Sequence, residues 1–71
     1  MTQRFSVGDR VMWMSEAGEV SGRITRAHTA DFDYNGHIRE ASEDHPQYEV
    51  VSDATGHEAA HRGECLTRID D

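Results

Sequence analysis

Short runs of alternating hydrophobic and polar residues make up most of this chain, and turn-forming residues separate them. Val20, Gly22 and Ile24 alternate with polar neighbours, which predicts a half-buried strand running to about His28. A glycine inside a strand is typical of a bend or a close backbone approach. We therefore expect another segment of the chain to pack tightly against Gly22.

A β-hairpin is predicted between Tyr48 and His61. Residues 48–52 are rich in strand-forming side chains, and Asp53-Ala54-Thr55-Gly56 follows with the composition of a turn. A type I turn with Gly56 in the left-handed conformation would close such a hairpin. Pro46 cannot donate to a strand ladder, so the first strand should begin after it.

A second hairpin is predicted over residues 31–40, where Asn35-Gly36 is the strongest two-residue turn signal. This turn places Tyr34 opposite His37 and Phe32 opposite Arg39. Side chains that face each other across a hairpin share one face of it. The resulting candidate ligand-binding face consists of Phe32, Tyr34, His37 and Arg39, while Asp33 and Ile38 point the other way.

Together these segments predict an all-β fold in one domain spanning residues 5–69, with short tails at 1–4 and 70–71. The architecture expected is a small SH3-like (Tudor-like) antiparallel barrel of about five strands, with an extra β-hairpin around Asn35-Gly36. A short irregular turn of the 3₁₀ kind is expected over residues 62–66. The predicted core consists of Val7, Val11, Trp13, Val20, Ile24, Tyr48, Val50, Ala60, Leu66 and Ile69.

The net charge of −7 comes from seven arginines and fourteen acidic residues, with no lysine. Such a surface repels phosphates and anionic lipid, which disfavours nucleic acid and membranes as partners. Neither a signal-peptide-like apolar run nor a membrane-spanning stretch is present in the sequence. The lone Cys65 rules out an internal disulfide and fits a reducing compartment. We expect a cytoplasmic monomer or weak oligomer.

Several stretches resemble the hypervirulence-associated protein Tudor domain family, within the SH3/Tudor-like barrels. The matching stretches are Val7–Val11 with Trp13, His28–His37, Ala41–Asp44, Pro46–Tyr48, Ser52–Gly56 and Ala59–His61. The resemblance covers about residues 5–69 and implies a barrel that acts as a binding module. Gly63-Glu64-Cys65 departs from the Pro, Glu and Ala expected there, so Cys65 is not a thiol shared by the family.

The Phe32/Tyr34/His37/Arg39 face is the first candidate site, because aromatic ring faces attract cations and Asp31 and Asp33 lie nearby. The alternative is that both aromatic rings pack onto the barrel as a satellite core.

Three other patterns have plainer interpretations. His57, His61 and Cys65 recur at a four-residue spacing that suits metal ligands on a helix. On a strand, however, His57 and His61 would be about 13 Å apart. A Cys65–His61 nucleophile lacks any orienting third group, so Cys65 is expected to be a small buried residue. The acidic run Glu40, Glu43 and Asp44 is expected to be a solvated loop.

The sequence therefore favours a non-catalytic module that binds a protein or peptide without cofactor or metal, and its negative charge favours a basic partner. Two alternatives stay open. One is nucleic-acid binding through Arg23, Arg26, Arg39, Arg62 and Arg68, which the charge balance opposes. The other is a small structural or stress-associated protein without a dedicated ligand.

Overall fold

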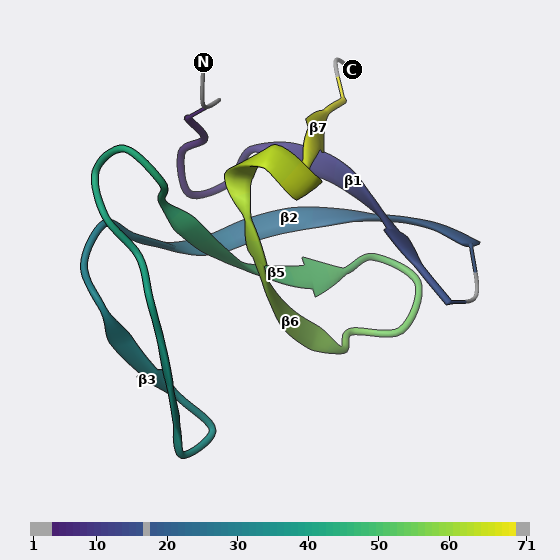
Figure 1. The fold of residues 1–71 in the computed structure, drawn as a ribbon. Coiled ribbons are helices and arrows are strands. Elements are labelled where there is room, and N and C mark those ends of the chain that lie inside the picture. The colour runs from purple at the N-terminus through teal and green to yellow at the C-terminus, as the bar shows by residue number, and fades with distance from the viewer. Residues whose placement is uncertain (1–3, 17, 70–71) are drawn as a thin grey trace.

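The computed structural model describes residues 4–16 and 18–69, whose strands form two antiparallel sheets (Figure 1). The larger sheet has the order β6-β5-β2-β1-β7, and the smaller one pairs β3 with β4. A short 3₁₀ helix, Gly63–Cys65, lies between β6 and β7. The strands are β1 (Arg10–Ser15), β2 (Gly18–His28), β3 (Phe32–Tyr34), β4 (His37–Arg39), β5 (Gln47–Ser52), β6 (Glu58–Arg62) and β7 (Thr67–Arg68).

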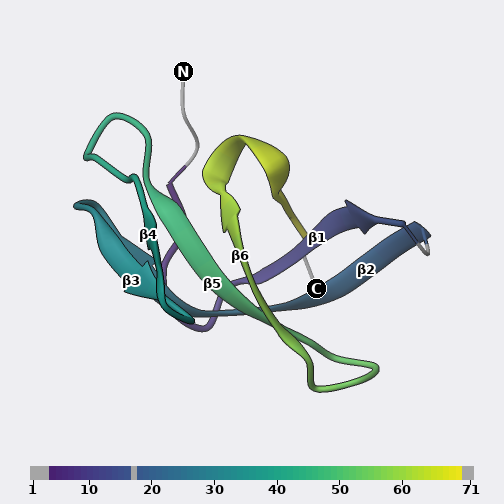
Figure 2. The same cartoon turned by 60° about the horizontal axis from the view of Figure 1, so that its bottom comes forward.

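This architecture confirms the all-β expectation, including five strands in the main sheet and a separate hairpin. The long strand β2 pairs with β1 along one edge and with β5 along the other. Its register against β5 shifts between Ile24 and Arg26, and such a bulge bends a strand and increases its twist. The β3–β4 hairpin projects from one side of the larger sheet (Figures 1 and 2).

The core lies on one face of the larger sheet and differs from the predicted one at the N-terminal end. Val7 was expected inside but is 65% exposed, whereas Phe5 is 7% exposed. Phe5 is held by its main-chain N–H, which donates to the Tyr48 hydroxyl at 3.1 Å, and by an edge-on contact between the two rings. The core cluster comprises Phe5, Val11, Trp13, Ile24, Tyr48, Val50 and Leu66.

Of the remaining predicted core positions, Val20 and Ile69 are peripheral, whereas Ala60 is buried as expected. Val20 packs against the cluster from a half-buried position, and Ile69 is half-buried. Ala60 is buried, but its neighbour Ala59 is the alanine that packs against the core cluster. This follows from strand alternation, since Ala59 pairs with the core residue Val50.

The turn residues adopt the conformations that the sequence predicts. Asn35 and Gly36 have φ values of 54° and 83°, as both central residues of a type I′ turn require. Gly56 has a φ of 76° and its N–H donates to Ser52 O, which closes the β5–β6 hairpin. The strand after Pro46 begins at Gln47.

Of the predicted tails, residues 1–3 and 70–71 lie outside the described part of the chain. Arg4, the innermost residue of the N-terminal tail, contacts the domain. Its guanidinium donates to Glu43 O at 2.7 Å, and its carbonyl accepts from Arg68 Nη2 at 3.1 Å. The residues described include no helix of the length and apolarity needed to cross a bilayer.

Candidate functional site

The β3–β4 hairpin contacts the main sheet through an aromatic stack between His28 and Phe32. The two rings are 3.6 Å apart between centroids and nearly parallel, at 3°. His28 lies at the end of β2, where it pairs with Gln47. The side chains of His28 and Gln47 therefore lie on the sheet face opposite the core, since Gln47 alternates with the core residue Tyr48. One face of the Phe32 ring is covered by this contact.

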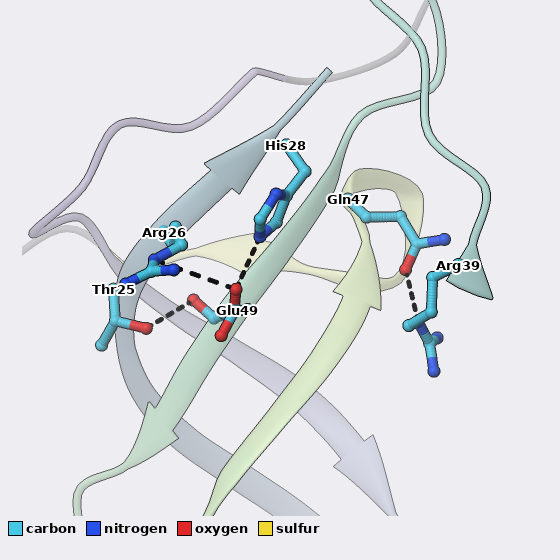
Figure 3. A network of polar contacts seen from close by, with 6 residues as sticks. All are labelled: Thr25, Arg26, His28, Arg39, Gln47 and Glu49. Atoms are coloured by element: carbon cyan, nitrogen blue, oxygen red, sulfur yellow. Dashed lines mark hydrogen bonds and ion pairs between the residues drawn. The ribbon is translucent and has the colours of Figure 1, made fainter. Parts of the chain in front are cut away.

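The Glu49 carboxylate fixes the orientation of the His28 ring (Figure 3). His28 Nε2 lies 2.6 Å from Glu49 Oε2, and both side chains are less than one-fifth exposed. Because an ionised carboxylate only accepts hydrogen bonds, Nε2 carries the proton and donates it. Glu49 Oε2 also lies 4.0 Å from Arg26 Nε, and the Glu49 main-chain oxygen accepts from Thr25 Oγ1.

Arg39 connects β4 to the same side of the sheet. Its Nε donates to Gln47 Oε1 at 2.9 Å, and its Nη2 lies 3.4 Å from Ala60 O. Gln47 is only 3% exposed and donates in turn to Glu40 O at 2.6 Å. A buried amide with both ends bonded holds its partners firmly. Arg39 therefore anchors the hairpin to the larger sheet.

The structure confirms the register that puts Phe32, Tyr34, His37 and Arg39 on one face. Phe32 and Tyr34 are half-buried, with ring centroids 6.4 Å apart at 74°. Neither ring belongs to the core cluster. His37, directly opposite Tyr34, is exposed. The arrangement is thus an aromatic pair beside an exposed histidine, with Arg39 holding the far end.

His28 and Glu49 are the residues that sequence reasoning missed. They are diagonal neighbours across β2 and β5, because His28 pairs with Gln47 and Glu49 pairs with Arg26. The alternation over 47–52 places Glu49 away from the core, but the pairing with β2 becomes visible only once the register is known. The bulge in β2 shifts that register.

The histidine and cysteine candidates are separated in the structure. His57 precedes β6, and Cys65 is in the 3₁₀ helix. His61 lies within β6, where its ring centroid is 5.6 Å from that of Trp13. Cys65 is exposed, so the expectation of a buried residue was wrong. Within residues 4–16 and 18–69, no three His, Cys, Asp or Glu side chains come together in a metal-binding arrangement.

Burial lowers the pKa of His61 below its ordinary value of 6.5, and the nearby Arg39 charge lowers it further. Both effects disfavour the protonated ring. His61 is therefore held as a neutral side chain against Trp13, which suits packing better than ligand chemistry.

Several of the described arginines lie beside carboxylates. Arg10 pairs with Asp53 at 2.8 Å, and Arg68 pairs with Asp9 at 3.1 Å. A shallow hollow at the base of the β3–β4 hairpin has carboxylates in its lining. The residues that line it are Asp31, Glu40, Ala41, Ser42, His45, Arg62 and Glu64. Glu40, Glu43 and Asp44 are all exposed, as a solvated loop would be.

A family model described as "Hypervirulence associated proteins TUDOR domain" matches residues 8–66, which is most of the chain. No curated protein and no solved structure matches.

Proposed function

Because the chain belongs to the hypervirulence associated proteins TUDOR domain family, we propose that it is a small protein- or peptide-binding module without catalytic activity. The binding face is the aromatic side of the β3–β4 hairpin, with Phe32, Tyr34 and His37 as contacts and Arg39 as the residue that fixes their position. No cofactor or metal is needed for such binding.

The observation that supports this proposal most strongly is the position of the two aromatic rings. Phe32 and Tyr34 remain half-exposed and lie outside the core cluster, although a chain this small has few aromatic side chains with which to build its interior. The satellite-core alternative accounts for one face of Phe32, which His28 covers. It does not account for the exposure of Tyr34 and His37 at the other end of the hairpin.

The charge of the whole chain, −7, favours a cationic ligand. Asp31 and Asp33 flank Phe32 and are exposed, and although they alternate with the two rings they add negative charge close to the face. Ring faces attract ammonium and guanidinium groups, and a negative surface speeds their approach. The ligand proposed is therefore a basic peptide segment, with lysine or methylated lysine against the rings.

The test is an NMR titration of the labelled protein with a lysine-rich peptide, with its trimethyl-lysine form and with an acidic peptide of equal length. We expect amide shifts in residues 32–39 with either basic peptide and little change with the acidic one. Tyr34→Ala should weaken binding about two- to fivefold, the range expected for an exposed cation–π contact. Ile38→Ala changes an exposed side chain on the opposite face and should leave binding unaltered.

Absence of shifts with all three peptides, or equal weakening by Tyr34→Ala and Ile38→Ala, would contradict the proposal. Short RNA and DNA duplexes at low salt form a further arm of the same titration. Saturable shifts with those ligands and none with peptide would favour the nucleic-acid alternative, whose affinity should then fall steeply with added salt.

A further inference from the structure

We propose that two copies of this chain associate by pairing their β6 strands antiparallel, which joins the two five-stranded sheets into one. Strand β6 is the first in the sheet order and pairs only with β5. It therefore forms an edge of the larger sheet (Figure 2). An edge strand presents main-chain groups that can pair with another chain.

The hydrogen bonds at the two ends of the β5–β6 ladder determine which groups point outward. Ser52 N donates to His57 O at 2.9 Å, and Gly63 N donates to Pro46 O at 3.2 Å. Directly opposed residues in an antiparallel pair alternate between bonded and non-bonded positions. Counting along the ladder, Glu58, Ala60 and Arg62 occupy the non-bonded positions, so their main-chain N–H and C=O groups are directed away from β5.

Some of the features that prevent edge pairing are missing from β6, although it is short and carries the charges of Glu58 and Arg62. The strand contains neither proline nor lysine, and its register against β5 runs without a shift. Among the described residues, one side-chain hydrogen bond reaches this edge, from Arg39 Nη2 to Ala60 O at 3.4 Å. That distance is at the long end for a hydrogen bond. Ala60 is only 8% exposed, so the guanidinium must rotate aside when a second strand pairs.

The sequence of β6 is complementary to itself. With the twofold axis at Ala60, Glu58 faces Arg62 of the second copy and Arg62 faces its Glu58. The two Ala60 residues meet at the axis, where their short side chains allow close approach. Each Ala60 N–H then reaches the other Ala60 carbonyl, and each Arg62 N–H reaches the other Glu58 carbonyl.

Within the described part of one copy, the charges that this pairing would neutralise have no ion-pair partner. Glu58 and Arg62 are exposed, and neither forms an ion pair with any other residue in the described ranges. They cannot pair with each other, since four residues of strand separate them by about 13 Å. A second copy supplies both missing partners at once, which an unrelated peptide does not do. The partner at the β6 edge is therefore a second copy of this chain.

The dimer should be weak, because two copies that each carry a charge of −7 repel. Sedimentation equilibrium over a wide range of protein concentration tests it with four proteins: wild type, Glu58→Arg, Arg62→Glu and the double variant. Each single variant places like charges opposite each other at two symmetric positions, and should raise the dimer Kd about tenfold or more. The double variant restores opposite charges and should recover the wild-type Kd.

Glu19→Arg is the matched control for Glu58→Arg, since it makes the same change of net charge at an exposed position of β2. We expect it to leave the dimer intact or slightly tighten it by reducing repulsion. Wild-type protein that stays monomeric at every concentration would overturn the proposal, as would a double variant no better than the singles. Circular dichroism of all five proteins separates loss of pairing from loss of fold.

Discussion

Replacing Gly22 with alanine tests how closely β2 and β5 approach each other. Gly22 lies in β2 and pairs with Val11 on one side and Ser52 on the other. An ideal Cβ placed on Gly22 would lie 1.9 Å from Val51 O and 2.8 Å from Trp13 Cη2. The first contact is with main chain, so no rotation of a side chain relieves it.

The expected loss of stability is large for a protein of this size. Separations below 3.0 Å are essentially never found for a real Cβ, so Val51 must shift by about 1 Å, against the ladder that joins β2 to β5. Overpacking a well-filled site costs about 1–3 kcal/mol and occasionally more. We expect at least about 3 kcal/mol here, out of a total free energy of unfolding of roughly 4–10 kcal/mol for 71 residues.

Urea denaturation followed by Trp13 fluorescence measures this loss. Ser21→Ala is the matched control at the adjacent position of β2, whose side chain points to the other sheet face, and it should change the free energy of unfolding by less than about 0.5 kcal/mol. If Gly22→Ala unfolds at the same urea concentration as wild type with an unchanged slope, the close approach of the two strands is wrong.

Two further substitutions test the buried hydrogen bond of Tyr48 and the lowered pKa of His61. Tyr48→Phe removes the buried hydroxyl that accepts the Phe5 N–H, which should lower the free energy of unfolding by about 1–3 kcal/mol in urea denaturation. A smaller loss than about 0.5 kcal/mol would show that the N–H finds another acceptor. Because the pKa of His61 is lowered in the folded protein, the unfolded chain binds the proton first, so stability should fall as the pH drops below about 6.5. His61→Gln should reduce the difference in unfolding free energy between pH 7.5 and pH 5. An unchanged difference would show that other titrating groups cause the pH dependence of stability.

Local chemistry explains which parts of the fold could be predicted. Positive φ at Asn35 and Gly36 follows from the turn type alone, and period-two alternation places Val50 inside and Glu49 outside. The same alternation fails at Val7. Gly8 lies in a turn with a φ of 94°, so the strand parity beyond it is lost and Phe5 enters the core instead.

The candidate site was predicted only in part, because its contacts are tertiary. The hairpin register gave the four residues on one face, but nothing local shows which surface that face meets. The stack of Phe32 on His28 and the bond from Arg39 to Gln47 both depend on how the hairpin folds back onto the sheet. The linking residues 29–31 and 40–46 set that approach and have no regular strand pattern to reveal it.

The short pairing of β7 with β1 has a mechanical consequence. It joins Val11 to Arg68 and Met12 to Thr67, and Ile69 N donates to Arg10 O at the end nearest both chain termini. A force that pulls the two ends apart would break these bonds one after another, beginning with the bond from Ile69 N to Arg10 O. The barrel should therefore yield first at β7 and at low force, and single-molecule stretching from the two ends would contradict this if β7 separated last.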